Sequence, residues 1–145
     1  MFKRLLIATD GSELAGKAVS TGLRLAKSLG AEVVGVVASE PWTAMVSGDG
    51  FALEFPMEEY DKGCAERAER ILAKVREDAA REGVACDTVH VKDFPAEGIM
   101  ATANAKSCDL IVMASHGRRG ISRLFLGSQT ARVVTLGTVP VLVCR

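Results

Sequence analysis

The feature that most constrains this chain is the alternation of short, almost wholly apolar runs with segments of helical periodicity. The apolar runs are rich in β-branched residues and predict strands at residues 3–9, 32–38, 86–92, 109–114 and 140–144. Strands that are apolar on both faces are typical of parallel sheets, because helices cover both faces of such sheets. The alternation therefore predicts an α/β fold with an open, parallel, five-stranded sheet and helices on both faces.

The segments between the strands carry apolar residues every three or four positions, which predicts helices at about 12–29, 60–83, 95–107 and 127–136. In the second of these helices the other positions are charged with mixed sign, Arg67 among them, and we expect a solvated face. The stretch 39–56 has no clean periodicity but contains Trp42 and two Phe residues. It is either a binding segment or a loop tucked onto the body of the protein.

Composition and charge limit the classes of function. Of the 145 residues, 48% are hydrophobic and 25% charged, which predicts one globular domain over residues 1–145. Lys and Arg number 18, as do Asp and Glu, so no net charge favours nucleic acid as a partner. No apolar run reaches the roughly 20 residues of a membrane span, and Asp10 ends the first apolar stretch too soon for a signal peptide. We therefore predict a cytoplasmic protein without membrane contact.

The four cysteines are widely scattered and include no C-x-x-C pair. Their spacing fits neither a zinc site nor a dithiol redox motif. We expect Cys64, Cys86, Cys108 and Cys144 to be reduced and mostly buried as small apolar residues.

Residues 11–18 nearly match the phosphate-binding pattern G-x-x-x-x-G-K-[ST] directly after the first strand. The last position is Ala18, so the hydroxyl that would hold Mg²⁺ is missing. Asp10 and Glu13 would also repel a phosphate. Because the segment fits an ordinary amphipathic helix with Ser12 as its N-cap, we interpret it as a helix start.

A stronger candidate site begins where the fourth strand ends and runs into the helix that starts near Ser128. Its glycines allow close approach of the backbone to a ligand, and the helix N-terminus presents N–H groups to an anion. Hydroxyl and guanidinium groups supply further donors that suit phosphate. The residues that carry these features are Gly117, Arg118, Arg119, Gly120, Arg123, Gly127, Ser128 and Thr130.

With these residues the sequence resembles the universal stress protein family over essentially its whole length. The most specific match is to the G-x2-G-x9-G-[ST] pattern of the family's ATP-binding members, whose second half is present as Gly117 and Gly127-Ser128. Ala114 stands where the first glycine is usual, and Asp93 stands where the family often has glycine. The other matching pieces are Ala8-Thr9-Asp10-Gly11-Ser12, Phe94-Pro95 and Pro140-Val141-Leu142-Val143.

The resemblance implies a Rossmann-like sheet of the adenine nucleotide α-hydrolase type with strand order 3-2-1-4-5. Ligands in such sheets lie where the strand order reverses, here between the first and fourth strands. The resemblance implies that ATP binds there, with Mg²⁺ or Mn²⁺ held mainly by the phosphates and no metal-ligating or catalytic residue. Asp10 is expected to bind the ribose, Val37 to meet adenine through its backbone, and the later residues to wrap the phosphates. The implied site residues are Ala8, Thr9, Asp10, Val37, Ala114, Ser115, His116, Gly117, Arg118, Arg119, Gly120, Gly127, Ser128, Gln129 and Thr130.

The leading hypothesis is a small ATP-binding protein of stress response that acts through an unknown regulatory protein partner. No residue set forms an efficient phosphoryl-transfer site, so at most slow ATP hydrolysis or autophosphorylation is expected. The alternative is a nucleotide-free dimeric interaction module of the same family, which Ala114 and Asp93 favour. A nucleotidyl transferase of related architecture would need paired histidines, and His90 and His116 are far apart in the sequence.

The last strand predicts a homodimer. The implied order puts Val141–Cys144 at a sheet edge, and no segment of this sequence follows Arg145 to cover it. An apolar edge is normally covered or paired, and a two-fold axis would pair it with the same strand of a second copy. The family resemblance also implies antiparallel dimers through this strand.

Overall fold

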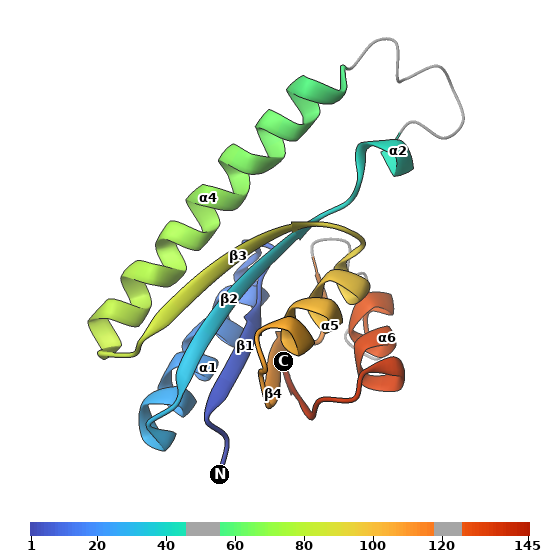
Figure 1. Ribbon diagram of the computed structural model, residues 1–145. Coiled ribbons are helices and arrows are strands. Elements are labelled where there is room, and N and C mark those ends of the chain that lie inside the picture. Colours follow the sequence, from blue (N-terminus) through green and yellow to red (C-terminus); the bar gives the residue numbers. More distant parts are fainter. Residues whose placement is uncertain (46–55, 118–125) are drawn as a thin grey trace.

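A parallel sheet of five strands runs through the middle of the computed structural model, which describes residues 1–45, 56–117 and 126–145 (Figure 1). The strands are β1 (Arg4–Ala8), β2 (Glu32–Ser39), β3 (Cys86–Lys92), β4 (Leu110–Ala114) and β5 (Val141–Cys144). Their order in the sheet is β3-β2-β1-β4-β5, and every neighbouring pair is parallel. The predicted α/β fold and strand order are confirmed.

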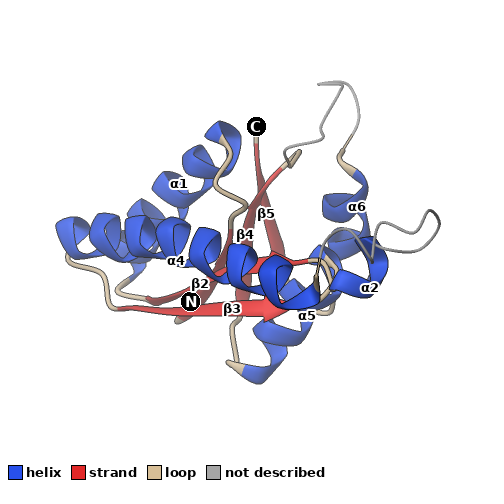
Figure 2. Cartoon of the chain, turned by 90° about the horizontal axis from the view of Figure 1, so that it is seen from above, coloured by secondary structure: helices blue, strands red, loops and turns tan. Residues whose placement is uncertain are grey.

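Helices cover both faces of this sheet, as Figure 2 shows for α1 and α4 on one face and α5 on the other. The helices are α1 (Glu13–Leu29), α2 (Trp42–Met45), α4 (Met57–Glu82), α5 (Pro95–Ala105) and α6 (Ser128–Leu136). Two separate apolar clusters fill the two interfaces. One contains residues of α1 and α4, and the other contains residues of α5 and α6.

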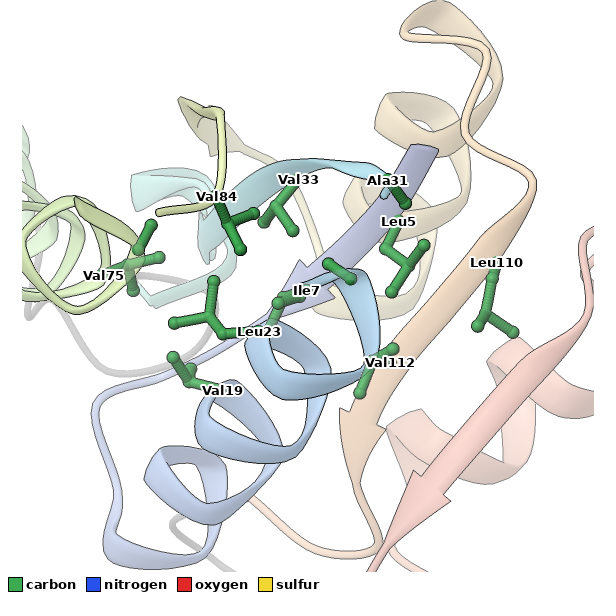
Figure 3. Packing of buried hydrophobic residues seen from close by; sticks show 12 residues of the cluster. Leu5, Ile7, Val19, Leu23, Ala31, Val33, Val75, Val84, Leu110 and Val112 are labelled. Carbon is green, nitrogen blue, oxygen red and sulfur yellow. The ribbon is translucent and has the colours of Figure 1, made fainter. Parts of the chain in front are cut away.

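Successive residues of β1 supply the two clusters in turn. Leu5 and Ile7 pack with Val19 and Leu23 of α1 (Figure 3), whereas Leu6 belongs to the cluster under α5 and α6. All three strand residues are 0% exposed. Because side chains alternate between the faces of a strand, a strand covered on both sides must be apolar throughout. This is the pattern from which the sheet was predicted.

The helix ends follow local capping. The Ser12 side chain accepts a hydrogen bond from the Ala15 N–H at the start of α1, and Gly30 ends that helix in the left-handed region at φ 65°. The near-match to a phosphate loop is therefore a capped helix start, as interpreted. None of the described helices has the length and apolar character needed to cross a membrane.

Two boundaries differ from the predictions. Helix α4 begins at Met57, one turn before the first periodic residue. Strand β2 continues to Ser39, and the short helix α2 occupies part of the segment expected to be irregular. The remainder of that segment, with Phe51 and Phe55, lies outside the described residues.

The connections after β1 and β4 create a crevice. The chain after β1 enters α1 on one face of the sheet, and the chain after β4 leads to α6 on the other. Because β1 and β4 are neighbours in the sheet, the two connections diverge from adjacent strand ends and leave a crevice between them. A ligand site in an open α/β sheet is expected at such a point.

Candidate functional site

A cavity of about 500 Å³ opens at the carboxyl ends of β1, β2 and β4. Its volume falls within the range of roughly 300–1,000 Å³ that is usual for small-molecule sites. It reaches from the start of α6, past the end of β1, to the N-terminal half of α4. The cavity therefore coincides with the crevice between the diverging connections.

Most of the predicted site residues meet in this cavity. Ser115 is buried and is not among the lining residues, and Arg118, Arg119 and Gly120 lie outside the described part of the chain. The predicted residues that line the cavity are Ala8, Thr9, Asp10, Val37, Ala114, His116, Gly117, Gly127, Ser128, Gln129 and Thr130.

The turn after β1 presents Asp10 to the cavity. The Thr9 hydroxyl accepts the Gly11 N–H at 3.1 Å, and Asp10 Oδ1 accepts the Ser12 N–H at 2.9 Å. Gly11 has φ 79°, a left-handed conformation that glycine adopts without steric cost. This carboxylate is therefore held by its own turn before any ligand arrives.

Backbone approach is closest between this turn and the loop after β4. A Cβ atom added to Gly117 would lie 3.1 Å from Asp10 Oδ2, tighter than ordinary contacts. A side chain at this position would require the carboxylate to shift by a few tenths of an ångström. The sequence pattern identified Gly117 by its spacing, and the structure supplies the reason.

The end of β2 offers backbone groups to the cavity. The carbonyl of Val36 accepts the Thr9 N–H on the β1 side at 3.0 Å, and the carbonyl of Ser39 accepts the Asp93 N–H on the β3 side at 2.9 Å. Backbone groups of successive strand residues point to opposite neighbours. Val37 therefore faces β3 with its N–H and C=O, and Ala38 faces the β1 side. The β1 ladder ends at Val36, so the Ala38 groups point past the end of β1.

The start of α6 forms the opposite end of the cavity. The first bond inside this helix runs from the Ala131 N–H to the Gly127 carbonyl at 2.9 Å. The N–H groups of the three preceding residues, Ser128 to Thr130, have no partner within the helix, and all three residues line the cavity. A helix N-terminus of this kind favours an anion.

Several side chains of this end are used within the protein. The Thr130 hydroxyl donates to the Ala114 carbonyl at 2.9 Å, and Gln129 Oε1 accepts the Ala96 N–H of α5 at 3.1 Å. Ser115 Oγ lies 3.0 Å from Nδ1 of the adjacent His116. These side chains shape the loop and join helices, and the backbone N–H groups at the start of α6 are donors at this end of the cavity.

Helix α4 forms a wall that the sequence did not predict. Its cavity-lining residues are Tyr60, Cys64, Arg67 and Ala68, which share one face of the helix. The expectation that Arg67 belongs to a solvated face is wrong, because its side chain turns toward the end of β1. The apolar stripe through Tyr60, Cys64 and Ala68 was visible, but nothing in the sequence indicated that it meets a cavity.

Two hydrogen bonds fasten this wall to the strand ends. The Tyr60 hydroxyl donates to the Glu40 carbonyl at 2.6 Å, and one terminal nitrogen of Arg67 donates to the Asp10 carbonyl at 3.0 Å. Burial is the main cause that raises the pKa of Tyr60 to about 12, with Cys64 as the next contributor. The phenol therefore stays a hydrogen-bond donor at physiological pH.

Other predicted features lie outside the cavity. Asp93, which stands where the family often has glycine, is not a lining residue, and its Oδ1 accepts the Phe94 N–H at 2.8 Å. Lys17 is exposed on α1 and is not a lining residue. Within the described ranges, no group of three or more His, Cys, Asp and Glu side chains could hold a metal ion.

Comparison with known proteins gives one consistent answer. The sequence matches the universal stress protein family over residues 1–145. It is 38% identical to a universal stress protein of Thermus aquaticus, encoded in the QAH/OAS sulfhydrylase 3′ region, and 34% identical to universal stress protein YxiE of Bacillus subtilis. Each alignment covers 100% of both chains.

Solved structures share the fold. The structure of hypothetical protein MJ0577, from Methanocaldococcus jannaschii, superposes with a TM-score of 0.82 at 26% identity and covers 99% of this chain and 96% of its own. Two more distant structures are a universal stress protein in complex with cAMP and the Archaeoglobus fulgidus universal stress protein in complex with dAMP. They superpose with TM-scores of 0.73 and 0.70 at 21% and 18% identity and cover 99% and 100% of this chain and 97% and 98% of their own.

Proposed function

The chain belongs to the universal stress protein family, and from this premise we propose that it binds an adenine nucleotide, ATP in particular, in the cavity between β1 and β4. One observation carries the proposal. A single cavity joins the strand-end backbone of Ala38, which lies beyond the last paired residue of β1, the Asp10 carboxylate and the N-terminus of α6. These three features suit a base, a sugar and a phosphate chain in that order. Nucleotides in the cAMP and dAMP complexes of the same fold are in keeping with this chemistry.

The base end would select adenine. In Ala38 a backbone N–H and C=O point past the end of β1 into the cavity. Adenine offers an acceptor at N1 and a donor at N6, which complement this pair, whereas guanine offers the opposite polarity at both positions. We therefore assign the adenine contact to the backbone of Ala38 in place of Val37. GTP is expected to bind at least about tenfold more weakly than ATP.

The sugar and phosphates would follow from the other two features. The Asp10 carboxylate, fixed by the Ser12 N–H, accepts hydrogen bonds from ribose hydroxyls. The N–H groups of Ser128, Gln129 and Thr130 at the start of α6 bind phosphate oxygens. A divalent cation, when bound, would be held mainly by the phosphates and would neutralise part of their charge. Turnover of the nucleotide is expected to be slow, because the described lining residues include no lysine to complete a phosphoryl-transfer cradle.

A second function is favoured by Ala114. This residue lines the cavity with a methyl group where the ATP-binding pattern has its first glycine. A nucleotide-free interaction module of the same family would retain the fold and lack the ligand. Asp93, the other residue that favoured a nucleotide-free module, is not among the residues that line the cavity, so it gives this alternative no support.

Assembly and cellular role extend the proposal. Among the described strands, β5 pairs only with β4 and lies at the sheet edge, with Val141–Cys144 half-buried. We expect this edge to pair with the same strand of a second copy. The resulting homodimer would report nucleotide occupancy to a regulatory partner in the cytoplasm.

Nucleotide content of protein purified without added ligand tests the proposal directly. Heat denaturation should release an adenine nucleotide into the supernatant, identified by chromatography. Millimolar ATP should raise the melting temperature of protein stripped of nucleotide, and GTP should raise it less. A clean supernatant together with an unchanged melting temperature would favour the nucleotide-free module.

A further inference from the structure

We infer that Arg67 of α4 is a positioning residue that holds Asp10 in the orientation needed for the ribose hydroxyls. The inference rests on the proposed nucleotide site and adds α4 to the elements that set its specificity. Arg67 lies 57 residues from Asp10 in the sequence, and its terminal nitrogen donates to the Asp10 main-chain carbonyl at 3.0 Å.

The environment of Arg67 differs from that of its neighbours in the charged part of the helix. Its side chain is half-buried and lines the cavity, and its Nε atom is shielded from solvent. Arg70, three residues further along the same helix, is exposed and does not line the cavity. An arginine is seldom withdrawn from water without a specific partner. Solvation at the surface therefore does not explain the position of this guanidinium, whereas its hydrogen bond at the end of β1 does.

The bond matters because of the residue that follows Asp10. Gly11 adopts φ 79°, and because glycine has no side chain, rotation of the Asp10–Gly11 peptide is less restricted than it would be before another residue. Within the turn, Asp10 Oδ1 accepts the Ser12 N–H and Thr9 Oγ1 accepts the Gly11 N–H. Both bonds move with the turn as a unit. Arg67 ties the turn to a different element of the fold, so it fixes the whole turn relative to the cavity.

A small rotation of this turn would have a direct effect on the ligand. Asp10 Oδ2 already lies 3.1 Å from the position that a Cβ atom on Gly117 would occupy. The carboxylate therefore has a narrow range of positions between the loop after β4 and the space for the sugar. Loss of the Arg67 tie is expected to widen that range and to weaken the hydrogen bonds to ribose, while base and phosphate contacts persist.

The test compares ATP with 2′,3′-dideoxy-ATP, which lacks both ribose hydroxyls. Affinities are measured by calorimetry for the parent protein and for Arg67→Met, which keeps an unbranched side chain and removes the guanidinium. Arg70→Met is the matched control on the same helix.

The parent is expected to prefer ATP over the dideoxy nucleotide by about tenfold, the scale of a hydrogen bond to a charged group. Arg67→Met should bind ATP about tenfold more weakly, bind dideoxy-ATP as the parent does, and so lose the preference. Arg70→Met should keep the preference. A merely structural contribution of Arg67 would lower both affinities together and overturn the inference, as would an unchanged preference.

A double-mutant cycle with Asp10→Ala tests the role of Arg67 separately from nucleotide binding itself. If Arg67 acts through Asp10, the Arg67→Met change should have no further effect on ATP affinity once Asp10 is replaced. Additive losses would overturn the inference and leave nucleotide binding in place. A parent that binds neither nucleotide would instead refute the proposed function.

Discussion

Gly127 lies where the loop between β4 and α6 approaches its own beginning. Its N–H donates to the Ser115 carbonyl at 2.8 Å, and a Cβ atom there would lie 3.1 Å from the same oxygen and 3.3 Å from the His116 Cα. Its φ of −57° is ordinary. The glycine is needed for close contact between backbones, and both neighbours are main-chain atoms that cannot rotate away.

Replacement of Gly127 by Ala is therefore expected to push the residues before α6 away from the backbone of Ser115 and His116. ATP affinity should fall at least about tenfold, with a loss of stability of roughly 1–3 kcal/mol from the crowded contact. Calorimetry and thermal unfolding measure the two effects. Gly16→Ala is the control, since a Cβ atom there meets nothing within 4 Å.

Lys17→Ala extends the comparison to the near-match at residues 11–18. Lys17 is exposed on α1 and does not line the cavity, so ATP affinity should stay within twofold of the parent. Abolished binding in this variant would move the site to the start of α1.

Cys108 gives a prediction about alkaline stability. The four cysteines are free, and burial raises the pKa of Cys108 to about 11 from 9.0. The folded protein therefore holds this proton more tightly than the unfolded chain. The resulting stabilisation is complete below about pH 9 and is lost as the pH rises toward 11.

Urea unfolding of the parent and of Cys108→Ala between pH 8 and 11, with reductant present, measures this contribution. The free energy of unfolding of the parent should fall more steeply above pH 9, by up to about 2 kcal/mol relative to the variant. Equal pH dependence in the two proteins would show that the thiol has the same pKa in the folded and unfolded states.

At the scale of elements, the strands and helices were predictable because each carries its own periodicity. Strand β4 is apolar at every position and β1 at every position after Arg4, and the stripe in α4 repeats every three or four residues. A helical pattern reveals an apolar face but does not identify what that face meets. For this reason α4 was expected to be a wholly structural helix, although Tyr60 and Arg67 turn to the cavity.

The residues of the candidate site also fall into those that a local sequence pattern predicts and those that only the folded structure reveals. Spacing identified Gly117, Gly127 and the start of α6, because glycine and helix N-termini leave a local signature. The role of Ala38 depends on which neighbour each backbone group of β2 faces, and that follows from strand register. The role of Arg67 depends on a contact across 57 residues. Neither can be read from a local pattern.

Gln129 connects the first turns of two helices. Its Oε1 accepts the Ala96 N–H, a donor that α5 cannot satisfy internally because it lies in the first turn. Gln129→Ala should therefore cost about 1 kcal/mol, or about 3 °C in melting temperature. ATP affinity should change by less than threefold, because the backbone N–H of residue 129 remains. A large loss of affinity at unchanged stability would assign the side chain to the phosphates.

At the scale of the whole molecule, the free edge of β5 determines how two copies can meet. The carbonyls of Pro140 and Cys144 accept hydrogen bonds from Ile111 and Ser115, so alternate residues of the strand face β4. Val141 and Val143 therefore direct their N–H and C=O groups outward. These outward groups are the ones that a second copy would bind.

Val143→Pro should weaken the homodimer without breaking the ladder to β4. It removes one outward N–H, whereas Val143→Thr keeps that N–H and serves as the control. Light scattering during gel filtration should give a dimer for the parent and the threonine variant, and a shift toward monomer for the proline variant. A monomeric parent at tens of micromolar would refute pairing through this edge.

The backbone of Ser115 links this outer edge to the interior of the protein. Its N–H donates to the Cys144 carbonyl at 2.7 Å, and its C=O accepts the Gly127 N–H at 2.8 Å. A movement of the last residue of β5 can therefore reach the start of α6 through the two peptide planes that meet at the Ser115 Cα. A second subunit and a small ligand could then influence each other without contact. Such coupling is reciprocal. If dimerisation changes the affinity of each subunit for its ligand, bound ligand should change the affinity of the two subunits for each other by the same factor.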